Sequence, residues 1–122
     1  MHELSIAISL LDVAAEEAQN HGGGRVLAIY LRLGPLSGVV SAALLSAFEL
    51  ARESEGMEQC RLLIEETPIV LDCAVCQGPQ PARSIQEICC ATCGTPTMNL
   101  ISGRELEVTA MELSDEHANA SG

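Results

Sequence analysis

Apolar positions near the start of the chain recur with the period of an α-helix. Between Leu4 and about Asn20 they fall three or four residues apart, which places them on one side of a helix. The segment HGGG at positions 21–24 follows, and glycine readily takes the left-handed conformation that ends helices. The pattern therefore predicts a first helix over residues 4–20. Its expected buried stripe is Leu4, Ile8, Leu11, Ala15 and Ala18.

The next segments alternate between strand-like and helix-like patterns. Residues 25–34, RVLAIYLRLG, have the two-residue period of a β-strand, with leucine or isoleucine at 27, 29, 31 and 33 on one face. Further strands are predicted at 60–66, at 98–101 and in GRELEVTAMEL at 103–113. Helical spacing returns from about Val39 to Glu53. The expected buried stripe of this second helix is Val40, Leu44, Ala47, Phe48 and Ala51.

This order of elements predicts an α+β fold. A strand, a helix and a second strand in succession suggest a βαβ unit, and the last strand is expected to return to the same sheet. Two helices on one face of a small mixed three-stranded sheet would enclose one core. We therefore expect residues 1–69 and 102–113 to form one α/β domain, with residues 70–101 as an inserted zinc-ribbon-like domain. Residues 114–122 are polar and acidic, and are predicted to be a disordered tail.

The inserted segment contains two C-x-x-C pairs, Cys73 with Cys76 and Cys90 with Cys93. Each pair can bend around one ion, and two pairs complete a tetrahedral thiolate zinc site with bonds of about 2.3 Å. Because four thiolates leave no open position, the zinc is expected to be structural rather than catalytic. A short polar segment without a core of its own needs such a link.

Other roles for the cysteines stay open at this point. Cys89 directly precedes Cys90 and could replace it as a ligand in a C-x-x-x-C pair. Otherwise Cys89 and Cys60 are expected to be small apolar fillers. A thioredoxin-like redox role requires a C-x-x-C at the start of a helix, whereas both pairs are predicted to lie in loops.

Charge limits the partners of the chain. Six basic and 17 acidic side chains give a net charge of −11, which disfavours nucleic acids and anionic membrane surfaces. No apolar run is long enough to span a membrane, and Asp12 interrupts the only stretch near the start that resembles a secretory signal. We therefore predict a cytoplasmic protein, in which six cysteines are reduced thiols or metal ligands rather than disulfides.

The start of the chain, Met-His-Glu, is a second candidate metal site. The amine of Met1 and the backbone and ring nitrogens of His2 can close fused rings around one ion. Glu3 could add its backbone nitrogen or a carboxylate oxygen, and nitrogens in a plane suit Ni(II) or Cu(II). The plainer interpretation is that His2 is an ordinary surface residue and that Glu3 complements the helix dipole.

Four features of the chain are the segments MHELSIA, HGGGRV and LRLGPLSGV and the two cysteine pairs. Together they resemble the HypA/HybF family of nickel metallochaperones, over about residues 1–113. The resemblance implies a carrier rather than an enzyme. It implies a HypB-type partner GTPase and delivery of nickel to the large subunit of NiFe hydrogenase, and for some members a role with urease maturation proteins. The family's second pair often has proline where Ala91 stands here. The implied ligands are Met1, His2 and Glu3 for transported nickel, and Cys73, Cys76, Cys90 and Cys93 for structural zinc.

A zinc-ribbon module that binds proteins or nucleic acids is the alternative function. Zinc ribbons often have that role, yet a net charge of −11 and two aromatic residues leave little for phosphate contacts or base stacking. A metal-dependent enzyme is a third possibility, but the sequence shows no second cluster of catalytic type. The salt dependence of any binding to nucleic acid would distinguish this alternative from a nickel carrier, because phosphate contacts weaken as salt is added.

Overall fold

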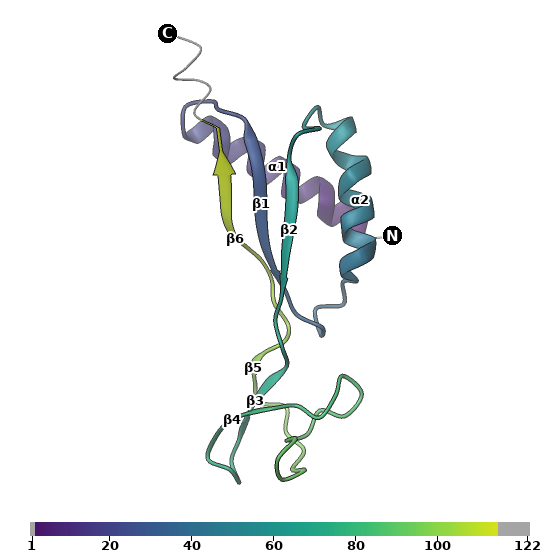
Figure 1. The fold of residues 1–122 in the computed structure, drawn as a ribbon, viewed down its shortest axis with the longest axis vertical. Coiled ribbons are helices and arrows are strands. Elements are labelled where there is room, and N and C mark those ends of the chain that lie inside the picture. Colours follow the sequence, from purple (N-terminus) through teal and green to yellow (C-terminus); the bar gives the residue numbers. More distant parts are fainter. Residues whose placement is uncertain (1, 115–122) are drawn as a thin grey trace. The chain divides into compact units, whose positions relative to one another are not determined.

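The computed structural model describes residues 2–114 of the chain, so Met1 and most of the predicted tail at 114–122 lie outside the described residues. The strands form two three-stranded sheets, ordered β2-β1-β6 and β4-β3-β5 (Figure 1). No helix in the described part is long and apolar enough to cross a membrane. The elements are α1 (His2–Asn20), β1 (Val26–Leu33), α2 (Ser41–Ser54), β2 (Arg61–Glu66), β3 (Val70–Cys73), β4 (Gly78–Pro81), β5 (Leu100–Ser102) and β6 (Leu106–Leu113).

The chain divides into two compact units. Among the described residues, the first unit, here called the helical unit, consists of residues 2–31, 40–64 and 108–114. The second, here called the cysteine unit, consists of residues 32–39 and 65–107. The cysteine unit contains the predicted insert of 70–101 together with adjoining residues of β1, β2 and β6 and the loop that follows β1.

The first sheet confirms the predicted mixed arrangement. β1 and β2 run in the same direction with α2 between them in the chain, and β6 returns in the opposite direction on the other side of β1 (Figure 1). At one end of the β1–β6 pair the Ser114 N–H donates to the Arg25 carbonyl at 2.8 Å. At the other end the Gly34 N–H donates to the Glu105 carbonyl, also at 2.8 Å. This pairing makes β1 the central strand, and Ile29, which is fully buried, lies in its middle.

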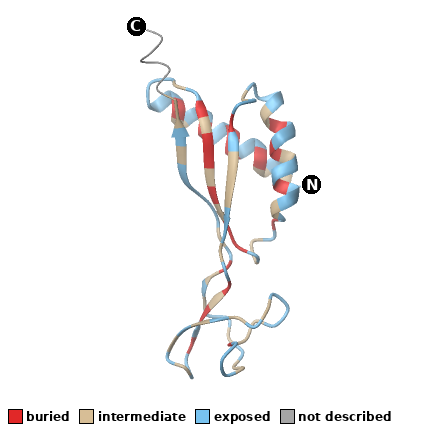
Figure 2. Ribbon diagram, in the orientation of Figure 1, coloured by how far each residue is buried: buried red, intermediate tan, exposed pale blue. Residues whose placement is uncertain are grey.

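The core of the helical unit shows where the predicted stripe of α1 is wrong (Figure 2). Leu4 and Ile8 are 44% and 36% exposed, and Ala15 is also exposed. The helix is rotated so that small side chains face inward, which lets it pack closely, and alanines give a weaker sequence signal than leucine or isoleucine. The buried residues of α1 are Ala7, Leu10, Leu11, Ala14 and Ala18.

The predicted stripe of α2 is largely confirmed. Leu44, Phe48 and Ala51 are its buried residues. Val40 is the exception, with 62% of its surface exposed. The reason is that the helix begins at Ser41 rather than at about Val39, so that Val40 is the N-cap with an extended backbone rather than part of the helical face.

The second sheet was only partly predictable. β3 pairs antiparallel with β4, from Val70 opposite Pro81 to Cys73 opposite Gly78. Neither strand was predicted, and β5 lies at 100–102 rather than at 98–101. Proline is unfavourable within strands, and two of the four residues of β4 are prolines, so the sequence pattern of this segment gives no strand signal.

A close backbone approach inside the cysteine unit depends on two glycines. A side chain at Gly34 would clash with the backbone of Gly103 and Arg104. Gly103 itself has a φ of 124°, a conformation that L side chains rarely adopt. The carboxylate of Glu105 adds a polar link here, because its Oε1 accepts hydrogen bonds from the Thr67 hydroxyl at 2.6 Å and from the Gly103 N–H at 2.8 Å.

We expect Glu105→Gln to lower the free energy of unfolding by about 1 kcal/mol at pH 7, the usual worth of such a hydrogen bond. The Thr67 hydroxyl, and the backbone donors with it, hold the pKa of Glu105 below its ordinary value. A pKa lowered in the folded state stabilises the protein above the unfolded-state pKa, and this contribution is lost as the pH falls through the folded pKa. The difference between the two proteins should therefore be constant from pH 8 to pH 5 and shrink below about pH 4.

Urea unfolding followed by circular dichroism at a series of pH values measures this difference. Both proteins have the same cysteines, so any acid sensitivity of a metal site cancels between them. Glu87→Gln is the matched control, because Glu87 has only an exposed ion pair at 4.0 Å with Arg83. A loss in Glu87→Gln as large as that in Glu105→Gln would contradict the assigned role.

Candidate metal centre

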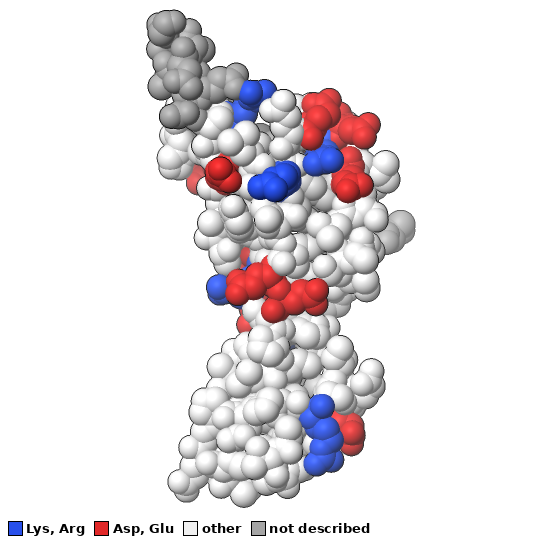
Figure 3. Space-filling view, viewed as in Figure 1, with Lys and Arg blue, Asp and Glu red and all other residues white. Residues whose placement is uncertain are grey.

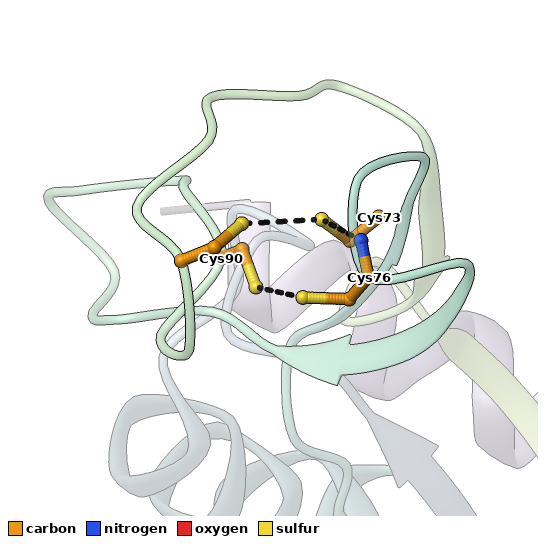
Figure 4. Close-up of side chains that lie close together, drawn as sticks. Cys73, Cys76 and Cys90 are labelled. Carbon is orange, nitrogen blue, oxygen red and sulfur yellow. Dashed lines mark hydrogen bonds between the residues drawn. The ribbon is translucent and has the colours of Figure 1, made fainter.

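Two tight turns of the cysteine unit bring four sulfurs together. Cys73 ends β3, and Cys76 lies in the turn that leads to β4. Cys90 and Cys93 flank a second turn later in the chain. The Sγ atoms of all four cysteines lie within 4.8 Å of one another. Figure 4 shows Cys73, Cys76 and Cys90 pointing into one common space between the loops.

The sulfur separations match a tetrahedral metal site. The Cys73 and Cys93 sulfurs are 3.5 Å apart, and the Cys76 and Cys90 sulfurs are 3.8 Å apart. Four sulfurs about 2.3 Å from one ion at tetrahedral angles lie about 3.8 Å from each other, which is the geometry of thiolate-bound zinc. Two of the sulfur separations thus match this geometry, and the others are at most 4.8 Å, so the cluster fits a tetrahedral metal ion such as zinc.

The backbone of the two turns has related geometry. The residue after each pair, Gln77 and Gly94, has a positive φ of 60° and 80° respectively. In the first turn the Cys76 N–H points at the Cys73 sulfur at 3.4 Å. In the second the Gly94 N–H donates to the Cys90 carbonyl at 2.7 Å. Such turns aim backbone donors at thiolates, and these donors stabilise the negative charge.

The ionisation of the cluster indicates that it needs a cation. Desolvation raises the pKa of Cys76 to about 12, with hydrogen bonds to the other thiols contributing. The hydroxyl of Thr95, 3.0 Å from the Cys93 sulfur, lowers the pKa of Cys93 to about 6. Thiols this close cannot all lose their protons unless a positive ion compensates the charge, and a divalent metal supplies that charge.

The small core of the cysteine unit depends on the same residues. Its fully buried members are Leu71, Cys73 and Cys90. The expectation that the insert lacks a core is thus too strict, but two of these three residues belong to the sulfur cluster. Cys76, Ala82, Ile88 and Leu100 pack against them.

The remaining cysteines lie outside the cluster. The backbone of Cys89 forms a bridge with Pro96, and its carbonyl accepts a hydrogen bond from the Arg83 N–H at 2.9 Å. Cys60 is fully buried in the helical unit, as a small apolar filler would be. Within residues 2–114 the four-cysteine cluster is the only group of three or more potential metal-ligating side chains.

The amino-terminal candidates begin α1. His2 is its first residue and is exposed, whereas Met1 lies outside the described residues. Glu3 is half-buried, and its Oε2 accepts a hydrogen bond of 3.4 Å from the Val40 N–H, which is the main cause that lowers the pKa of Glu3. Val40 is the N-cap of α2 and forms no side-chain cap of its own. The contact of Glu3 with the start of α2 could not be found from sequence spacing, because 37 residues separate the partners.

Fold and site define a small α+β protein with a zinc-ribbon-like unit that carries a four-cysteine metal site. A family model described as "Hydrogenase/urease nickel incorporation, metallochaperone, hypA" matches residues 1–113. The chain therefore belongs to the HypA family, the nickel metallochaperones of hydrogenase and urease nickel incorporation, and is not an enzyme.

Individual relatives agree with this assignment. The hydrogenase maturation factor HypA of Roseiflexus sp. (strain RS-1) is 40% identical over 120 residues, covering 98% of both chains. That of Deinococcus radiodurans is 40% identical over 108 residues, covering 88% of this chain and 89% of its own. The solution structure of the Ni metallochaperone HypA from Helicobacter pylori has the same fold, with a TM-score of 0.63, 23% identity and coverage of 93% and 97%.

Proposed function

We propose that this chain binds Ni(II) at Met1, His2 and Glu3 and passes it, together with a HypB-type GTPase, to the large subunit of NiFe hydrogenase. The observation that carries the proposal is the position of His2, an exposed imidazole in the first turn of α1. An exposed site suits a carrier, because a partner must reach the ion in order to take it.

The start of a helix is chemically suited to nitrogen ligation. The first four N–H groups of an α-helix have no acceptor within the helix, so backbone nitrogens of His2 and Glu3 can give up a proton to bind metal without breaking a helical hydrogen bond. The positive end of the helix dipole stabilises the negative charge that this deprotonation creates. The amine of Met1 and the ring of His2 would complete a planar set of the kind Ni(II) prefers.

Zinc has a different role in this proposal. Cys73, Cys76, Cys90 and Cys93 hold one zinc ion permanently, and all four positions of that ion are filled by thiolates. Transported nickel and structural zinc are thus kept apart by ligand type, since thiolates bind zinc strongly and amine, amide and imidazole nitrogens favour nickel.

Metal analysis of untagged protein, with and without added Ni(II), tests the proposal. We expect one zinc per chain in both samples and one additional nickel in the second. A sample that takes up no nickel after exposure to Ni(II) would contradict the carrier role of this chain.

The partner GTPase is expected to dock on the exposed apolar side of α1. Leu4, Ile8 and Val40 are 44%, 36% and 62% exposed, and Val40 contacts Glu3 through its N–H. Transfer requires donor and acceptor sites to approach, so a surface next to His2 is the natural contact. The double variant Leu4→Glu/Ile8→Glu should weaken association by about tenfold or more, the usual effect of losing an apolar anchor.

Surface plasmon resonance with the GTPase measures this effect, and Leu50→Glu is the control. Leu50 is 69% exposed on α2, so the same kind of change is made on another helix. Association should also slow with added salt, as expected for an acidic protein that meets a more basic surface. Crosslinks confined to the cysteine unit would contradict the proposed contact.

A further inference from the structure

The last strand of the helical unit, β6, lies at an edge of its sheet. The order β2-β1-β6 places no strand beyond β6 among the described residues. Six of its eight residues are exposed, and Val108 in its middle is 38% exposed. An exposed edge strand presents a row of backbone N–H and C=O groups that can pair with another extended chain.

A groove accompanies this edge. It has a volume of about 690 Å³ and lies between α1 and the strand. Val13 and Glu17 lie four residues apart on one side of α1, and His21 follows directly after the end of the helix. Val13 is 50% exposed. The strand contributes residues 108–111 and Leu113 to the groove, so that an added strand would find apolar contacts beside the free edge.

Acidic side chains outnumber basic ones around this edge. Glu107 and Glu112 are exposed on β6, and Glu17 lines the groove, whereas no lysine or arginine is among the groove's lining residues. Arg32 approaches Glu107 at 3.4 Å but is shared with Glu65 at 3.5 Å. Figure 3 shows more acidic than basic side chains on the face that carries β1, β2 and β6. Many proteins protect edge strands with lysine, so carboxylates here leave the edge open to a basic strand.

A second copy of this chain is a poor occupant of the edge. Pairing of two copies along β6 would bring their Glu107 and Glu112 carboxylates to one joint, and like charges close together destabilise strand pairs. Each copy also has a net charge of −11. The chain after Ser114 carries Asp115 and Glu116, so it meets the same repulsion.

We propose that β6 and the groove beside α1 bind an extended segment of a partner protein, in which basic and apolar residues alternate. The segment adds to the sheet as a fourth strand. Its backbone pairs with β6, its apolar side chains enter the groove, and its basic side chains, which point to the other face of the sheet, approach Glu107. Strand addition of this kind takes affinity from backbone hydrogen bonds and specificity from alternate side chains. It does not require nickel at the amino terminus.

The probe is an acetylated and amidated eight-residue peptide in which lysine alternates with valine, added to zinc-loaded, nickel-free protein. Fluorescence anisotropy of a labelled peptide gives the affinity. The same peptide with every backbone nitrogen methylated keeps its side chains and charge but has no N–H donors. We expect it to bind at least about tenfold more weakly, since several hydrogen bonds of about 1 kcal/mol are lost.

Hydrogen exchange locates the peptide. Exchange of backbone amides in β6 should slow on binding, whereas exchange in β2, the other edge of the same sheet, should not change. Equal binding of the two peptides, or slowed exchange in β2 rather than in β6, would overturn the proposal.

Charge reversal adds a second arm to the test. Glu107→Lys is expected to weaken peptide binding about fivefold, which corresponds to a cross-strand charge pair of about 1 kcal/mol. Glu49→Lys makes the same change of charge at an exposed position of α2 and should alter binding by less than about twofold. Equal weakening in both variants would indicate attraction to net charge only and would overturn the proposal.

Truncation tests whether the chain's own end occupies the edge. If a protein that ends at Ser114 binds the peptide more than about tenfold tighter than the full chain, the chain's own end occupies the edge, and this result also overturns the proposal.

Discussion

Cys90→Ser is expected to release zinc and unfold the cysteine unit, whereas Cys89→Ser is expected to do neither. The two residues are neighbours in the chain, yet only the Cys90 sulfur belongs to the four-sulfur cluster. Cys90 is also fully buried in the small core of this unit. Structural zinc contributes about 10–16 kcal/mol in zinc-finger peptides, more than the whole stability of a typical domain. Loss of one ligand therefore removes the main stabilising interaction of the unit.

The helical unit should survive this loss because its apolar core is separate. Phe48, Leu11 and Ile29 are buried there, and none of them belongs to the sulfur cluster. Far-ultraviolet circular dichroism should therefore keep its helical signal in Cys90→Ser. Amide resonances of the cysteine unit should collapse to narrow, disordered shifts in the same sample.

Metal content and folding of both variants decide the prediction. Zinc is measured by atomic absorption on protein purified under reducing conditions, with the wild-type chain as reference. Cys60→Ser is an additional control for the loss of a thiol in the helical unit. Zinc retained in Cys90→Ser, or lost in Cys89→Ser, would contradict the prediction and show that Cys89 rather than Cys90 is the ligand.

The parts of the fold that could be predicted are those with strong periodic signals. Burial in β1 alternates from Ile29 to Leu33 as predicted, and the place of this strand in a mixed sheet followed from the strand–helix–strand order. The four cysteines were identified because chelation requires a fixed spacing that is visible in the sequence. Burial of Leu44 and Phe48 followed from helical spacing in the same way.

The parts that could not be predicted depend on tertiary contacts. The inward side of α1 includes Ala7 and Ala14, whose small side chains are a weak signal, so Leu4 and Ile8 were expected inside instead. β4 has the sequence GPQP and forms a strand only because β3 lies beside it. The hydrogen bond between Glu3 and Val40 joins residues from two helices, and no local pattern contains that information.

His2→Ala is expected to abolish nickel binding while the fold and the zinc content stay unchanged. His2 is exposed, so its ring contributes little to stability. Removal of the ring leaves an amine and backbone nitrogens that no longer close the fused chelate rings on which the proposed site depends. His21→Ala is the matched control, since His21 is an exposed histidine just after the other end of α1 and its Nδ1 lies 2.9 Å from the Glu17 carbonyl.

Glu3 could bind nickel through its backbone nitrogen or through its carboxylate, and one substitution distinguishes the two. Glu3→Gln keeps the backbone nitrogen and an oxygen that can accept the Val40 N–H, but removes the negative charge. Nickel affinity close to that of the wild type would indicate that Glu3 contributes its backbone nitrogen. A large loss with an unchanged fold would indicate that the carboxylate is a ligand.

Calorimetric titration with Ni(II) decides the assignment to the amino terminus. Ligation requires nitrogen atoms without their protons, so affinity should fall as the pH is lowered. A residue added before Met1 should weaken binding nearly as much as His2→Ala, because the amine is then displaced, whereas an extension after Gly122 should have no effect. Undiminished nickel affinity in His2→Ala, with loss in His21→Ala, would move the nickel site away from the start of α1 and leave His2 as an ordinary surface residue of a helix.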